Sequence, residues 1–230
     1  MLECRRLISY YPSSKLTGEA IYLMGESFLG AGNYKDAALA FERHYSEHRG
    51  SLTKVAESYY RAGRFGSGIA KLKDYASETD AADYLIGWGY LGKHLFNESS
   101  IVFHYLSTRE GEFKEASASL SKDSLLGLRL PSKSPWVSGI LSAVLPGLGQ
   151  VYSERAYDGM ISFFFNAVFL YLAVENNRIG NYGMGAFFSV IELGWYTGNI
   201  YSAVGAAHKY NKNQAEDFVR GLQVKYGFEF

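Results

Sequence analysis

The sequence has no excess of charge of either sign. It contains 23 basic and 23 acidic side chains in 230 residues, so its formal net charge is zero. Without a net positive charge, no long-range attraction to nucleic acid is expected, and nucleic acid is not predicted as a partner. Cysteine is nearly absent too. Cys4 is the only one, which excludes a disulfide within the chain and indicates nothing about the compartment.

Motifs for catalysis or metal binding are also missing. The segment GLGQVY lacks the Lys and the Ser or Thr of a phosphate-binding loop, and GNYGMG does not follow an expected strand. Of the five histidines, only His44 and His48 are spaced by four residues, and neither cysteine nor an HExxH motif accompanies them. A helix surface explains that spacing better than a zinc site. We therefore predict no enzymatic activity, no metal and no cofactor.

Charge is scarce in one long stretch, residues 136–207, which is rich in Phe, Leu, Ile, Val, Gly and Ala. Such a stretch is typical of a membrane segment, whereas residues 1–135 have the composition of a water-soluble helical module. We therefore predict an all-α chain whose two parts are adapted to two solvents. The six charged residues of the stretch are Glu154, Arg155, Asp158, Glu175, Arg178 and Glu192.

A repeat of 31 residues runs through the first part. A small residue, an aromatic residue, a turn residue, a second aromatic residue and a large apolar residue recur in that order. This pattern predicts units of two short helices that must stack to bury a core, with a turn of positive φ between the two helices. The recurring residues are Gly25, Phe28, Gly32, Tyr34 and Phe41, then Ala56, Tyr59, Gly63, Phe65 and Leu72, then Gly87, Tyr90, His94, Phe96 and Phe103.

The first unit, AIYLMGESFLGAGNYKDAALAF at 20–41, resembles a tetratricopeptide repeat. The second unit has Gly68 where that family prefers Ala, and the third has His94 in place of the turn Gly and Ser99 in place of the Ala. The resemblance covers residues 1–107 and implies a helical solenoid. The period is shorter than the family's period of about 34 residues, which implies shorter connections between units.

The same resemblance implies a binding groove on the inner faces of the first helices. An aromatic groove rimmed by Glu suits an extended peptide or a helix with apolar and basic anchors. For Tyr22 and Tyr84, packing between repeats is an equally good interpretation. The implied partner-binding residues are Tyr22, Glu26, Leu29, Glu57, Tyr60, Tyr84, Trp88 and Leu91.

The two ends of the soluble part are less regular. Residues 3–14 resemble the second helix of an earlier repeat, which either caps the stack or follows a segment upstream, and residues 1–20 contain no apolar export signal. Residues 110–128 are expected to form a polar capping helix. Pro131 and Pro135 then end it, so residues 108–135 are predicted to be a capping helix and linker.

Three apolar segments follow, at 136–152, 159–174 and 184–207. A helix needs about 20 residues to cross a bilayer, so we expect spans at about 157–175 and 184–207. The first segment is interrupted by PGLGQ at 146–150 and is predicted to be interfacial or re-entrant. Residues 212–230 are predicted to be a polar tail.

A second resemblance concerns residues 136–211. LPGLGQVY followed by DGMISFFFNAVF is similar to small bacterial membrane domains of the TM-two hairpin family, which carry a PGxGQxY motif before two spanning helices. The family indicates little about biochemical role. The matching positions are Pro146, Gly147, Gly149, Gln150, Tyr152 and Gly159. Small residues also recur every four positions along the last span, at Gly194, Gly198, Ser202 and Ala206, where they allow close packing within the chain or between copies, so the oligomeric state is left open.

Polar residues inside the expected spans attract attention because they are costly in lipid. Glu192 is either a hydrogen-bonding link between helices or part of a proton or ion path. Asn166 and Glu192 lie at equal distances from Ile179, so we expect them to face each other at the same depth. Asn199 is the rival partner, because it lies two helical turns beyond Glu192 on the same face.

The expected orientation follows from the Lys and Arg residues near the spans. With two spans, six basic residues flank the hairpin and only Arg178 lies in its loop, which favours cytoplasmic repeats at a bacterial inner membrane. Three spans would leave no bias, and an export signal upstream would favour periplasmic repeats. The six flanking residues are Lys122, Arg129, Lys133, Arg155, Lys209 and Lys212.

Together these patterns predict a membrane-anchored helical-repeat adaptor that binds a protein partner through its solenoid groove. The alternative is a subunit of a membrane transport or envelope-assembly complex, with Glu192 lining a pathway. A channel activity that Glu192→Gln abolishes would favour the alternative.

Overall fold

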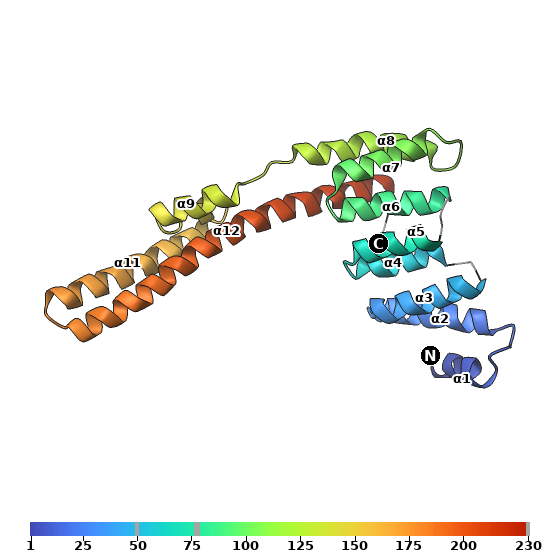
Figure 1. Cartoon of the computed structure of the whole chain (residues 1–230), viewed down its shortest axis with the longest axis horizontal. Coiled ribbons are helices and arrows are strands. Elements are labelled where there is room, and N and C mark those ends of the chain that lie inside the picture. Colours follow the sequence, from blue (N-terminus) through green and yellow to red (C-terminus); the bar gives the residue numbers. More distant parts are fainter. Residues whose placement is uncertain (49–50, 76–78, 229–230) are drawn as a thin grey trace. The chain divides into compact units, whose positions relative to one another are not determined.

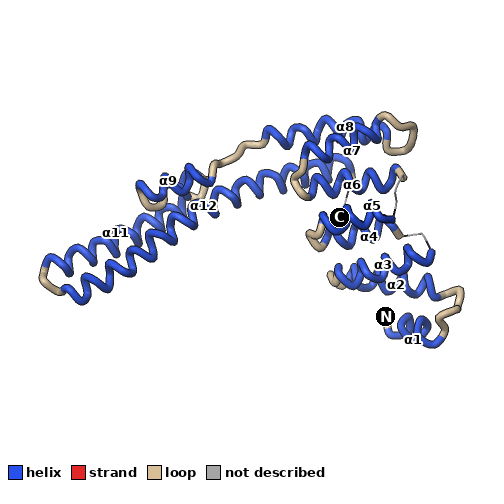
Figure 2. The backbone as a smooth tube through the Cα atoms, viewed as in Figure 1, coloured by secondary structure: helices blue, strands red, loops and turns tan. Residues whose placement is uncertain are grey.

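The structure is a computed structural model that describes residues 1–48, 51–75 and 79–228. Over these residues all regular secondary structure is helical (Figures 1 and 2), as expected for an all-α chain. The chain forms two compact units. The N-terminal unit comprises Met1–Arg129 together with Phe218–Phe230, and the middle unit comprises Leu130–Asp217.

Helices α1 to α8 of the N-terminal unit each pack against the next helix along the chain. This order of contacts is what short helical units joined by tight turns require. The helices are α1 (Leu2–Tyr10), α2 (Thr17–Gly30), α3 (Tyr34–His48), α4 (Leu52–Arg61), α5 (Phe65–Tyr75), α6 (Asp80–Gly92), α7 (Phe96–Ser107) and α8 (Lys114–Leu126), which is followed by a short 3-10 helix at Gly127–Arg129.

The turns inside the helix pairs recur at the period found in the sequence. Gly32, Gly63 and His94 have φ values of 73°, 68° and 59°, and they lie between α2 and α3, α4 and α5, and α6 and α7. A left-handed residue of this kind ends a helix and satisfies its last carbonyl groups. His94 adopts the conformation without being glycine, which is strained for an L-residue with a side chain.

Close helix crossings recur as well. A Cβ atom built on Gly25 would lie 2.6 Å from the ring of Phe41, and one built on Gly87 would lie 2.6 Å from the ring of Phe103. In the second pair the small residue is Ala56, which belongs to the same buried cluster as Leu72. Small residues therefore admit a large side chain from the following helix at equivalent positions.

The middle unit contains α9 (Pro135–Val144), α10 (Leu148–Tyr152), α11 (Ala156–Arg178) and the first part of α12 (Tyr182–Tyr226). The expected interruption at PGLGQ is present. Helix α9 ends before Leu145, Gly147 has a φ of 90°, and α10 then packs back against α9. Helices α11 and α12 run antiparallel and are joined by a short turn (Figure 1).

Among the described residues, α11 is the one helix long and apolar enough to cross a membrane, with a mean hydropathy of 1.5 in its most apolar window. Only 17% of that window is buried, unlike the core helix of a soluble protein. Residues 184–207, the second expected span, are helical but do not reach this hydropathy, because Gly, Ser, Thr, Tyr, Asn and Glu interrupt the apolar residues. Of the two expected spans, only the one formed by α11 is therefore supported by length and hydropathy.

The expected polar tail differs from what is observed. Helix α12 continues to Tyr226, and residues 218 onward belong to the N-terminal unit. Val219 and Leu222 are each 6% exposed, and the ring of Phe218 meets that of Phe96 edge to face at 5.5 Å. Apolar residues at 218, 219, 222 and 226 share one helix face, and the charged residues between them hide this pattern in the composition.

Candidate functional site

The middle unit has polar side chains inside and apolar side chains outside. Its buried apolar residues are all alanines (Ala173, Ala203, Ala206, Ala207 and Ala215), whereas its large apolar side chains lie on the surface. Trp136, for example, is 81% exposed and Val190 is 71% exposed. The side chains of Ser138, Ser142, Gln150, Ser153, Asn166 and Asn199 are buried instead. This polarity is the reverse of that of a soluble domain.

Gln150 is the centre of the buried polar network. Its Oε1 accepts a hydrogen bond from Ser142 Oγ at 2.9 Å, and its Nε2 donates to Asn199 Oδ1 at 2.9 Å. Ser142 Oγ also accepts from the backbone N–H of Gly149 at 3.0 Å. Ser138 Oγ lies 2.9 Å from Gly149 O and 2.7 Å from Ala203 O. The network joins α9, α10 and α12 and leaves the polar atoms of Gln150 satisfied.

Glycines permit this close packing. A Cβ atom on Gly147 would lie 2.1 Å from the carbonyl oxygen of Gly159, and one on Gly149 would lie 1.9 Å from that of Ser138. The helix-packing role expected for Gly147 and Gly149 therefore has a direct structural basis, and Pro146 precedes the left-handed turn. The hydroxyl group of Tyr152 accepts a hydrogen bond from the backbone N–H of Ser134 at 3.1 Å.

Gly194 and Gly198 differ from these glycines. A Cβ atom on either would meet no atom within 4 Å, and both residues are exposed on α12. They do not serve packing within the chain, which contradicts one of the two interpretations of the small-residue pattern. Close approach by a second copy stays a prediction.

Asn166 and Glu192, which we expected to face each other within direct or water-bridged hydrogen-bond reach, form no direct hydrogen bond. Asn166 Nδ2 donates to Ser162 O at 2.6 Å, while Asn166 Oδ1 and Glu192 Oε2 are buried without a hydrogen-bond partner. A water-bridged pair stays a prediction. Asn199, the rival partner, bonds with Gln150 instead.

Three residues of the implied binding groove are buried. Trp88 and Leu91 are 0% exposed and Tyr60 is 3% exposed, with its hydroxyl donating to Leu85 O at 2.9 Å. The structure does not present them in an open groove, because other parts of the same chain cover them, and their contact with a partner stays a prediction. Tyr22 and Leu29 are half-buried against the cluster that contains Phe41.

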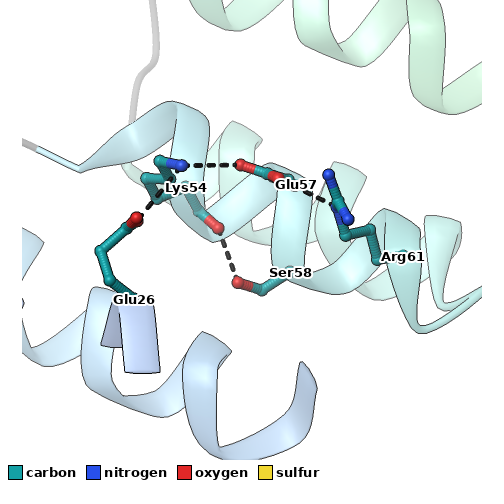
Figure 3. A network of polar contacts seen from close by, with 5 residues as sticks. All are labelled: Glu26, Lys54, Glu57, Ser58 and Arg61. Carbon is teal, nitrogen blue, oxygen red and sulfur yellow. Dashed lines mark hydrogen bonds and ion pairs between the residues drawn. The ribbon is translucent and has the colours of Figure 1, made fainter. Parts of the chain in front are cut away.

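The two glutamates of the implied groove are neutralised by the chain itself (Figure 3). Lys54 Nζ lies 3.2 Å from Glu26 Oε1 and 3.1 Å from Glu57 Oε2, and Arg61 Nε lies 2.9 Å from Glu57 Oε1. Burial alone would lower the pKa of Lys54, but its bonds to the two glutamates raise the pKa above its ordinary value. These glutamates therefore do not offer a free acidic rim to a basic ligand.

Tyr84 and Trp88 do contact a segment that is distant in sequence. The ring of Phe228 stacks on that of Trp88 with centroids 4.2 Å apart and planes 3° apart, and it meets Tyr84 edge to face at 6.1 Å. Nearby, Asp123 Oδ2 accepts from Tyr226 Oη at 2.6 Å and lies 2.6 Å from Lys225 Nζ. Asp123, Tyr226 and Phe228 were not among the residues predicted from the sequence. The apolar face of residues 218–226 is the sequence signal that indicates this contact.

The pKa values around Asp123 follow from these contacts. Burial alone would raise the pKa of Asp123, but the bonds from Lys225 and Tyr226 lower it below its ordinary value. Burial and the bond to Asp123 raise the pKa of Tyr226. Asp123 is therefore a charged anchor for the end of α12.

Comparisons with known proteins add no relative: no protein-family model matches this chain, and neither a curated protein nor a solved structure is significantly similar to it. Among the described residues, no group of three or more His, Cys, Asp or Glu side chains is placed to hold a metal ion.

Proposed function

We propose that the protein is a membrane-anchored helical-repeat adaptor. The middle unit inserts into a bilayer as a hairpin of α11 and the first part of α12, with α9 and α10 packed against it. The N-terminal unit is a tetratricopeptide-like solenoid that binds a protein partner.

The observation that carries the membrane assignment is the reversed polarity of the middle unit. An apolar exterior this large is unfavourable in water, whereas in hydrocarbon it replaces the contacts that lipid tails would make with one another. The buried network around Gln150 fits the same environment, because a polar group in hydrocarbon must find its hydrogen bonds within the protein.

Protein binding is supported by the N-terminal unit. Each of its helices α1 to α7 packs on the next helix along the chain, α4 also packs on α6, and close contacts recur at the 31-residue period. Such stacks present long, continuous surfaces to partners.

Membrane extraction tests the anchor, with the full chain expressed in bacteria. We expect the protein to stay with the membrane through high-salt and carbonate washes and to need detergent for release, because the attachment is hydrophobic. A matched variant, Val190→Lys with Leu193→Lys, places two charges on the outer face of α12 and should be released or degraded. Wild-type protein in the high-salt supernatant would refute the anchor.

A role in transport is the second candidate, and one observation favours it. Asn166 Oδ1 and Glu192 Oε2 are both buried without partners, and intramembrane carboxyl groups often mark ion or proton paths. Ion flux into liposomes that contain the purified protein, lost in Glu192→Gln, would support it. If liposomes that contain the wild-type protein show no ion flux, the transport role is refuted and the adaptor role remains.

A further inference from the structure

We propose that residues 218–228 act as a ligand of the N-terminal unit within the same chain, and that a partner binds the unit by presenting a segment of the same chemistry. That chemistry is a helix end with a basic residue, an aromatic hydroxyl group and a phenylalanine. The inference rests on the proposed adaptor function and names the kind of partner and its site.

The aromatic part of the site holds Phe228. Its ring lies flat on Trp88, and the edge of Tyr84 closes one side, while Tyr84 itself stacks on Phe113 at 4.6 Å. Offset and edge contacts of this kind contribute beyond simple burial of area. The site therefore has a defined shape for one planar ring.

The end of α12 presents that ring in a fixed geometry. Gly227 has a φ of 62°, and the Phe228 N–H donates to Gln223 O at 2.9 Å. This pattern ends a helix and turns the next side chain across it. Asp123, on α8, holds the last turn through Lys225 and Tyr226. The order Lys, Tyr, Gly, Phe is thus recognised by one carboxylate and one aromatic pocket.

The buried cluster next to Phe228 is built without any side chain of this segment. The buried cluster next to Phe228 consists of residues from α4, α5 and α6, and Phe228 packs against it as a partly buried neighbour. Helices α6, α7 and α8 make their own successive contacts. The segment also carries exposed side chains, including Val224 at 80%. On the other side of the helix, Val219 and Leu222 are each 6% exposed, so the segment docks on the unit through one apolar face.

A tethered ligand competes strongly with a free one. Segments held near their site on the same chain reach effective concentrations on the order of millimolar. A free peptide of equal affinity should therefore bind the wild-type chain poorly and bind it well once the internal segment is weakened.

Fluorescence anisotropy with a labelled peptide of residues 218–228 tests this in the full chain, purified in detergent. We expect Phe228→Ala combined with Lys225→Ala to bind the peptide at least tenfold more tightly than the wild type. Val224→Ala, on the exposed side of the same helix end, is the matched control and should behave as the wild type. Adding Asp123→Asn to the double variant, or replacing the phenylalanine of the peptide with alanine, should weaken binding at least fivefold.

Two results would overturn the proposal. One is equally weak peptide binding by the wild type and the double variant while both keep the same helix content in circular dichroism. The other is a double variant that loses helix content and binds no peptide, which would make the segment part of the core. Neither result affects membrane extraction or ion flux, so a failure here is distinct from a failure of the proposed membrane role.

Discussion

Replacing Gly149 with alanine should destabilise the middle unit strongly. The added Cβ atom would lie 1.9 Å from Ser138 O, 2.7 Å from Ser142 Oγ and 2.8 Å from the Cβ of Ala203. The nearest of these is a backbone atom, so α9 and α10 must separate by about 1 Å or more to restore ordinary contact. Overpacking of a dense interior typically costs about 1 to 3 kcal/mol.

The separation also weakens hydrogen bonds. Gly149 donates to Ser142 at 3.0 Å and its carbonyl group lies 2.9 Å from Ser138 Oγ, and intramembrane bonds contribute about 0.6 kcal/mol each. We therefore expect a total loss of about 3 kcal/mol, which for a chain of this size lowers the melting temperature by about 6 to 12 °C.

The measurement is thermal unfolding of the full chain in detergent, monitored by circular dichroism and by tryptophan fluorescence. Gly198→Ala is the matched control in the same unit. Its Cβ would meet no atom within 4 Å, and alanine improves helix propensity by up to about 1 kcal/mol. We expect the control to melt at or above the wild-type temperature. If Gly149→Ala melted with the wild type, the packing of α9 on α10 described above would be refuted.

Three further predictions concern the N-terminal unit. His94→Gly should raise its stability by about 1 kcal/mol, because glycine adopts a φ of 59° without the strain of a side chain; an unchanged or lower urea midpoint would contradict this. Gly25→Ala should lower stability by about 1 to 3 kcal/mol through the contact with Phe41, whereas Gly30→Ala, which meets no atom within 4 Å, should not, and equal midpoints for the two would argue against the close crossing. Docking of residues 218–228 should depend on acid: because the folded state lowers the pKa of Asp123, its contribution is complete above the ordinary value of about 4 and is lost as the pH falls through the lowered value. The protection of the α12 amides at 218–226, measured as the exchange rate relative to the intrinsic rate at the same pH, should therefore fall in acid, and a profile that Asp123→Asn leaves unchanged would assign the effect to another group.

The turns and the interruption at PGLGQ could be predicted because they depend on local residues. A left-handed turn needs glycine or a tolerated substitute, and Gly32, Gly63 and His94 occur at one spacing. Proline and two glycines likewise end a helix regardless of what packs nearby. The sequence pattern was therefore sufficient for the position of these breaks, although not for the direction in which α10 turns back on α9.

The partners of the buried polar residues could not be predicted in the same way. Helical periodicity placed Asn199 on the face of Glu192, yet its amide group bonds with Gln150, a residue 49 positions earlier in the chain. That choice depends on the left-handed Gly147, which turns α10, and on Gly149, where a Cβ atom would lie 2.8 Å from the Cβ of Ala203 on α12. Periodicity within one helix carries no information about such a contact.

The aromatic residues of the implied groove show why one helical spacing can indicate either a buried core or an open ligand groove. Tyr84 and Trp88 are spaced by one helical turn, and an aromatic stripe of that kind is equally suited to a core and to a ligand groove. What decides between them is a second segment, and here it is residues 218–228, which bring Phe228 onto Trp88 from 140 positions away. The polar and charged residues at 212–217 precede that segment and make the tail as a whole look polar, so the apolar face of residues 218–226 is visible only at helical spacing. Tyr84 and Trp88, two of the residues implied as partner contacts, therefore form a surface that Phe228 of the same chain occupies in this structure.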